Sequence, residues 1–143
     1  MKANELRIGN YVYYNGNHKH ISNVSSLQPK VYVEPYGAVC YSESIKVGLN
    51  NRFDIVYDVE NIEPIPLTEE WLIKFGFKYN GWNYDLNQYV FHAQGKNEKG
   101  EFFNTEFGIK NNDITFNMSY TINSVHQLQN LYFTLTNQEL NNE

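Results

Sequence analysis

The chain of 143 residues is poor in cysteine and has no long apolar run. Its single cysteine, Cys40, cannot form a disulfide within the chain, which is typical of proteins in a reducing compartment. No apolar run approaches the roughly 18 residues that are needed to span a bilayer. The first residues also lack the apolar stretch of a signal peptide. We therefore expect a cytoplasmic protein with no membrane segment.

Motifs for catalysis and metal binding are also missing. The sequence has no Gly-rich phosphate loop, no Gly-x-Ser-x-Gly and no His-Glu-x-x-His. His18 and His20 alternate on an expected strand and could face the same way, but a zinc site needs three or four ligands. Two histidines at the edge of a loop are the simpler interpretation. The sequence therefore predicts no metal and no cofactor.

A few scattered side chains could support catalysis, so an enzyme is a possible but less favoured functional class. His92 or His126 could act as a base. Glu106 or Asp113 could lie nearby, and Cys40 could be a nucleophile beside a distant histidine. Carboxylates in hairpins are usually solvated, however, and an isolated cysteine is more often a small core residue. The motif count therefore favours a protein without catalytic activity.

Basic residues are scarce in the second half of the chain. Residues 1–62 contain six Lys and Arg against six Asp and Glu, whereas residues 63–143 contain five against ten. The whole net charge of −5 thus belongs to the second half. Nucleic-acid binders usually have the opposite sign, because phosphate contacts supply most of their affinity. The charge argues against a nucleic-acid partner.

Residues 64–77 carry nearly complete signals for the start and the end of a helix. Thr68 is a candidate N-cap, and two glutamates follow it in the first turn, where the helix dipole favours them. Gly76 stands where a left-handed residue ends a helix. This helix separates an N-terminal β unit, residues 1–62, from a second unit, residues 63–143.

Residues 1–62 are typical of a small β-barrel. A strand at residues 11–14 ends in a turn at residues 15–17, and turn-rich segments separate the later strands. Those strands are expected near residues 20–24, 31–33, 39–41, 45–47 and 53–57. Short strands at this spacing favour an SH3-like barrel. Alternation leaves open whether Val12 and Tyr14 or Tyr11 and Tyr13 form the core pair.

Residues 63–143 predict a helix, an antiparallel meander and a C-terminal helix. Asn80-Gly81 suggests a type I′ hairpin. Alternating residues then indicate strands, with Phe103, Thr105 and Phe107 on one face. Ser124 is a candidate N-cap of the last helix, and a frayed tail is expected from residue 137 onwards. The apolar stripe expected on that helix consists of Val125, Leu128, Leu131, Tyr132 and Leu135. The predicted fold is α+β, with both units sharing one core because each is small.

Two candidate binding surfaces follow from these patterns. On the last helix, His126, Asn130 and Phe133 share a face opposite the apolar stripe. Phe133 could pack beneath the barrel, or this face could bind a partner or ligand. On the first strand, outward Tyr11 and Tyr13 could stack on a peptide or a base.

Three segments resemble uncharacterised small proteins encoded by phages and prophages of Bacteroidota. They are Leu6-Arg-Ile-Gly-Asn-Tyr-Val, residues 64–77, and Val125-His-Gln-Leu-Gln-Asn-Leu-Tyr-Phe-Thr-Leu-Thr. The resemblance implies a mobile-element origin and the cytoplasm of a bacterial host, and it brings no assigned catalytic residues. We expect a non-catalytic binding protein for counter-defence, which inhibits a host immune protein or sequesters a nucleotide signal. The alternative is a nucleic-acid-binding SH3-like module. The sequence leaves open whether the chain forms a homo-oligomer.

Overall fold

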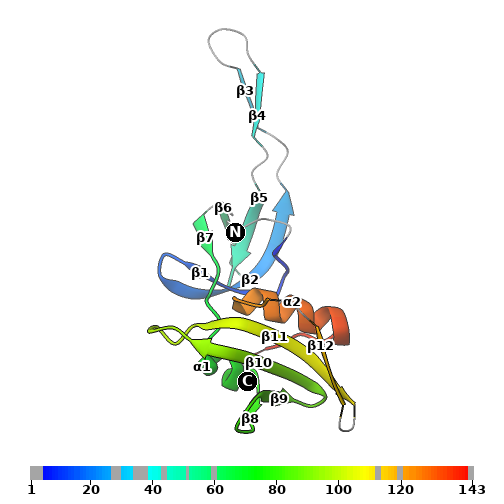
Figure 1. Ribbon diagram of the computed structural model, residues 1–143. Helices are drawn as coiled ribbons and strands as arrows, with labels where there is room; N and C mark the ends of the chain where they lie inside the picture. Colours follow the sequence, from blue (N-terminus) through cyan, green and yellow to red (C-terminus); the bar gives the residue numbers. More distant parts are fainter. Residues whose placement is uncertain are drawn as a thin grey trace. The chain divides into compact units, whose positions relative to one another are not determined.

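The computed structural model describes residues 5–26, 30–33, 39–42, 45–50, 52–58, 61–111, 114–118 and 121–141. Contacts divide the chain into two compact units, Met1–Pro64 and Ile65–Glu143. Both units contain antiparallel sheets, and the described helices belong to the second unit, so the fold is α+β (Figure 1). The sequence placed the division after residue 62. That the two units share one core stays a prediction.

The N-terminal unit contains a five-stranded antiparallel sheet in the order β6-β5-β2-β1-β7. Its strands are β1 (Tyr11–Tyr14), β2 (Asn17–Ser26), β5 (Ile45–Leu49), β6 (Arg52–Asp58) and β7 (Ile62–Glu63). A separate sheet pairs β3 (Lys30–Val33) with β4 (Val39–Ser42). Strands therefore form where the sequence predicts them. No pairing among the described residues joins β6 to β7, so the expected closed barrel is not formed by this part of the chain.

The core of the N-terminal unit decides which residues of β1 point inward. Its buried side chains are Leu6, Val12, Ile21, Leu49 and Ile62. Tyr14 packs against this cluster, so Val12 and Tyr14 are the core pair. Asn15 and Gly16 have φ values of 50° and 72°, which match the type I′ turn of a tight hairpin.

The C-terminal unit contains a five-stranded antiparallel meander in the order β12-β11-β10-β9-β8. Its strands are β8 (Lys78–Tyr79), β9 (Tyr84–Leu86), β10 (Tyr89–Lys96), β11 (Phe102–Asn111) and β12 (Ile114–Met118). The predicted type I′ turn at Asn80-Gly81 is wrong, because residues 80–83 form a wider loop. The Asn80 N–H donates to the Asn83 carbonyl at 2.9 Å, and Asn80 does not have a positive φ.

Helix α1 (Glu69–Lys74) ends as the sequence predicts. Gly76 has a φ of 85°, and its N–H donates to the Ile73 carbonyl at 2.9 Å. The Phe77 N–H donates to the Leu72 carbonyl at 3.0 Å, which completes a Schellman motif. At the start, Thr68 occupies the N-cap position, but its side chain makes no capping hydrogen bond.

The segment before α1 connects the elements of the C-terminal unit. The Leu67 N–H donates to the Asn123 carbonyl at 3.0 Å, and the Val125 N–H donates to the Ile65 carbonyl at 2.9 Å. The Phe102 N–H donates to the Leu67 carbonyl at 3.0 Å. Residues 65–68 are thus bonded both to the segment at the start of the last helix and to the start of β11, which fixes the position of α1.

Helix α2 (Val125–Thr136) packs on the meander, but its buried face differs from the predicted stripe. The Tyr132 ring lies 5.4 Å from the ring of Tyr89 on β10, between ring centroids. Leu131 and Leu135 are only half-buried. The buried side chains are Val125, His126, Leu128, Gln129 and Tyr132. The buried face is therefore rotated towards His126 and Gln129, away from the two leucines.

The chain beyond α2 is packed rather than frayed, which corrects the expectation for the tail as far as Leu140. Leu140 is 3% exposed, and the Gln129 side-chain amide donates to its carbonyl at 3.1 Å. The buried amide of Gln129 thus has an acceptor in this segment. Among the described residues, no helix is long and apolar enough to cross a membrane.

Candidate functional site

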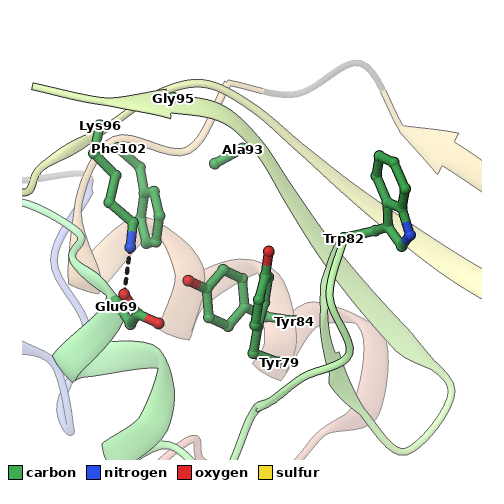
Figure 2. A pocket seen from close by; sticks show the side chains of 8 residues that line it. All are labelled: Glu69, Tyr79, Trp82, Tyr84, Ala93, Gly95, Lys96 and Phe102. Carbon is green, nitrogen blue, oxygen red and sulfur yellow. Dashed lines mark hydrogen bonds and ion pairs between the residues drawn. The ribbon is translucent and has the colours of Figure 1, made fainter.

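A hollow of about 210 Å³ opens on the C-terminal unit between α1, the β8–β9 hairpin and β10. Its aromatic lining consists of Tyr79, Trp82, Tyr84 and Phe102. Figure 2 shows Trp82 standing apart from the two tyrosines, with Lys96 and Glu69 on the opposite side of them. The hollow therefore combines aromatic faces with one pair of opposite charges.

The two aromatic residues nearest the hairpin loop are strongly exposed. Trp82 is 83% exposed and Tyr79 is 58% exposed, whereas Tyr84 and Phe102 are buried. The rings of Tyr79 and Tyr84 are 5.0 Å apart between centroids. Exposed aromatic side chains grouped around a concavity are typical of ligand and partner sites. This group is the strongest candidate site among the described residues.

The loop that carries Trp82 is braced by its own polar groups. The Asn80 side-chain oxygen accepts the N–H groups of Trp82 at 3.0 Å and Asn83 at 2.8 Å. Its amide nitrogen donates to the Asp85 carboxylate at 2.8 Å. The Tyr79 hydroxyl donates to the Gly81 carbonyl at 2.7 Å. These hydrogen bonds thus fix the backbone at Trp82 and the Tyr79 hydroxyl within the loop.

An ion pair between Glu69 of α1 and Lys96 of β10 forms the charged side of the hollow. Hydrogen bonds from Lys96 and then Tyr84 hold the pKa of Glu69 below its ordinary value of 4.5. The hydrogen bond with Glu69 raises the pKa of Lys96. Burial, followed by the hydrogen bond with Glu69, raises the pKa of Tyr84. At neutral pH the site therefore presents a carboxylate, an ammonium group and a neutral phenol.

The lowered pKa of Glu69 predicts a small pH dependence of stability. Glu69→Gln should lower the melting temperature near neutral pH, because the charged carboxylate is stabilised in the folded chain. This stabilisation is present above the unfolded pKa and is lost as pH falls through the lower folded pKa. The difference between the two proteins should therefore shrink below pH 4.5. A thermal melt of each from pH 7 to pH 2 measures it, and a constant difference would contradict the assignment.

Tyr11 and Tyr13 lie on the face of β1 opposite Val12 and are half-buried. Each is paired in register with a histidine of β2, and their rings are close. Tyr11 is 5.7 Å from His20 and Tyr13 is 4.6 Å from His18, between ring centroids. The two histidines therefore face the same way, as the alternation predicted. A binding role for the two tyrosines stays a prediction.

The second predicted surface is not uniformly exposed. His126 is 2% exposed, and its Nδ1 lies 3.0 Å from the Ser124 hydroxyl. Asn130 and Phe133 are half-buried. His126 was predicted opposite the buried face, and that part of the prediction is wrong because the buried face is rotated. Binding by Asn130 and Phe133 stays a prediction.

The candidate catalytic residues come together only in part. His92 and Glu106 are cross-strand partners on β10 and β11, and His92 Nδ1 lies 2.8 Å from the Asn83 side-chain oxygen. Asp113 and the side chain of Cys40 lie outside what the structure describes. The described residues contain no group of three or more His, Cys, Asp and Glu that could hold a metal.

The sequence predicted a hairpin at residues 79–82 but no binding site there. The available signal was two aromatic residues flanking Asn-Gly, where a turn exposes side chains to solvent. Phe103, which was predicted to share a face with Thr105 and Phe107, is 46% exposed, unlike those two, and covers Gly95 beside the hollow. Asn104 has a φ of 49°, and this left-handed residue interrupts the alternation along β11.

Comparisons with protein-family models, curated proteins and solved structures give no match to this chain.

Proposed function

We propose that this chain is a non-catalytic binding protein whose binding site is the aromatic hollow of the C-terminal unit. The observation that carries the proposal is the 83% exposure of Trp82 on a braced loop beside the hollow. Burying a large aromatic side chain is favourable, so a partner that covers it gains binding energy. Braced loops also lose little conformational entropy on binding.

The biological setting of this proposal is counter-defence in the cytoplasm of a bacterial host. The resemblance of three segments to phage and prophage proteins of Bacteroidota supports a mobile-element origin. The ligand is a host immune protein that is blocked, or a nucleotide signal that is sequestered. The charge of −5 favours the protein partner, because an acidic surface attracts basic surfaces and repels nucleotides.

A second candidate function is a nucleic-acid-binding module on the N-terminal unit. The outward Tyr11 and Tyr13, each against a histidine ring, favour it because aromatic faces stack on bases. This second proposal includes an SH3-like fold for the N-terminal unit. Such binding should weaken steeply with salt.

One retention experiment with matched double variants tests both candidates. Immobilised wild-type chain, Tyr79→Ala/Trp82→Ala and Tyr11→Ala/Tyr13→Ala are each exposed to host lysate, to nucleotides and to single-stranded RNA. We expect the first double variant alone to lose the ligand, since a buried aromatic anchor contributes about 2 kcal/mol or more at an interface. Circular dichroism melts confirm that each variant is folded.

Other outcomes are equally decisive. Loss of RNA retention only in the Tyr11→Ala/Tyr13→Ala variant would favour the nucleic-acid module. Equal retention of the ligand by the wild type and the Tyr79→Ala/Trp82→Ala variant would overturn the assignment of the site. If the wild type retains nothing, the proposal of a binding protein fails.

A further inference from the structure

We infer that the hollow binds the guanidinium group of an arginine side chain from a protein partner. This inference rests on the proposed binding function and names the chemistry of the partner. It follows from three properties of the lining residues: the exposed aromatic faces, the partly exposed carboxylate of Glu69 and the solvent exposure of the ion pair that Lys96 forms with it.

The aromatic faces suit a planar cation. Tyr79 is 58% exposed and lies between Trp82 and the Glu69 carboxylate in Figure 2, so its ring is open to stacking near that carboxylate. Trp82 is 83% exposed and stands farther from the charged pair. Guanidinium groups are planar and weakly hydrated, and they stack on the faces of Trp and Tyr. Within the same hollow, the Lys96 ammonium already lies 5.4 Å from the centre of the Phe102 ring. A cation is thus already placed against an aromatic ring of the lining.

The charge of the unit also favours a cation. Glu69 points its carboxylate to the hollow, and its side chain is 41% exposed. Residues 65–143 contain nine acidic and five basic side chains, so the surrounding unit is negative. An incoming arginine would be attracted from a distance, whereas a nucleotide phosphate would be repelled. The carboxylate and the guanidinium would form two parallel hydrogen bonds.

Lys96 forms an ion pair with the Glu69 carboxylate in the free protein, but a stronger cation can displace it. Its side chain is 39% exposed, and exposed ion pairs contribute little to stability. A lysine offers a point charge, whereas an arginine offers a planar fork that matches a carboxylate. The partner's arginine therefore displaces Lys96 from Glu69. It follows that Lys96 competes with the partner.

This competition gives a test. Removing the charge of Lys96 should strengthen the binding of an arginine peptide and weaken the binding of a phosphate ligand. The peptide acetyl-Gly-Arg-Gly-amide is titrated at millimolar concentration into the whole chain by calorimetry, with the citrulline peptide and guanosine monophosphate as comparison ligands. Citrulline has nearly the same shape without the charge. Trp82 fluorescence reports the same event, because the other tryptophan, Trp71, is 5% exposed.

Lys96→Met should bind the arginine peptide about threefold to tenfold more tightly, since the competing ammonium group is then gone from Glu69. Glu69→Gln and Tyr79→Ala should each bind it about tenfold more weakly, as expected when an ion pair or an aromatic anchor is lost. The citrulline peptide should also bind about tenfold more weakly. Lys99→Met and Glu98→Gln make the same charge changes on the exposed β10–β11 loop, and they should stay within about twofold of the wild type.

The outcomes separate this inference from the proposed function. Tighter binding by Lys96→Met with loss in Glu69→Gln supports it. Weaker binding by Lys96→Met, or preference for guanosine monophosphate over the arginine peptide, overturns it and leaves a binding site for an anion. If neither probe binds while the Tyr79→Ala/Trp82→Ala variant loses a retained partner, the arginine inference fails and the binding function stands.

Discussion

Thr105→Val should lower the free energy of unfolding by about 2–4 kcal/mol, although the two side chains have nearly the same shape. The Thr105 hydroxyl donates to the Ile122 carbonyl at 2.8 Å and accepts the Ile122 N–H at 2.7 Å. Thr105 is 3% exposed and Ile122 is fully buried. Valine would therefore leave two backbone polar groups of Ile122 buried without these partners.

Urea denaturation of the whole chain measures this effect, with Thr105→Ser as the matched control. Serine keeps the hydroxyl and loses only a methyl group, so it should cost about 1 kcal/mol, close to the value for one buried methylene. Valine should thus be clearly worse than serine. The reverse order would mean that the apolar contacts of Thr105 matter more than its two hydrogen bonds.

Leu140→Ala should lower the free energy of unfolding by about 2–4 kcal/mol, a large effect for a residue near the end of the chain. Leu140 is 3% exposed, and the residue's carbonyl accepts the buried amide of Gln129. Truncation of the side chain removes apolar burial and leaves a cavity beside α2. A loosened tail would also break the hydrogen bond from Gln129 to the Leu140 carbonyl, which adds to the loss.

The neighbouring Asn141 provides the control, because its side chain is exposed. Asn141→Ala should stay within about 0.5 kcal/mol of the wild type in the same urea series. If Leu140→Ala proves equally neutral, the segment after α2 does not pack in solution, and the expectation of a frayed tail from residue 137 would be restored.

Local signals in the sequence were sufficient where the physical cause is local. Gly76 ends α1 because a left-handed residue there costs glycine little, and this holds whatever surrounds the helix. Asn15 and Gly16 turn β1 into β2 for a similar reason. These positions could be predicted because each depends on the conformational preference of one or two residues.

The candidate site could be predicted only in part. Asn80-Gly81 correctly located a hairpin, but the side chain of Asn80 accepts two N–H groups and so opens a wider loop. That loop exposes Trp82 on the same hollow as Lys96 and Glu69, which are separated from it by 14 and 13 residues in the sequence. No period or spacing in the sequence indicates that these three residues line one hollow. Their arrangement depends on the register between β9 and β10 and on the position of α1.

The sequence by itself determined the α+β class, the order of strands and helices and the acidic charge of the second half, because these follow from composition and from periods of two and 3.6 residues. Tertiary structure alone decided which face of α2 is buried and where the tail packs. Hydrogen bonds from residues 65–68 position the start of α2, and the buried Leu140 with its bond from Gln129 positions the tail. These contacts join residues that are far apart in the sequence. A helical period identifies an apolar stripe, but it cannot show that the amide of Gln129 has a buried partner.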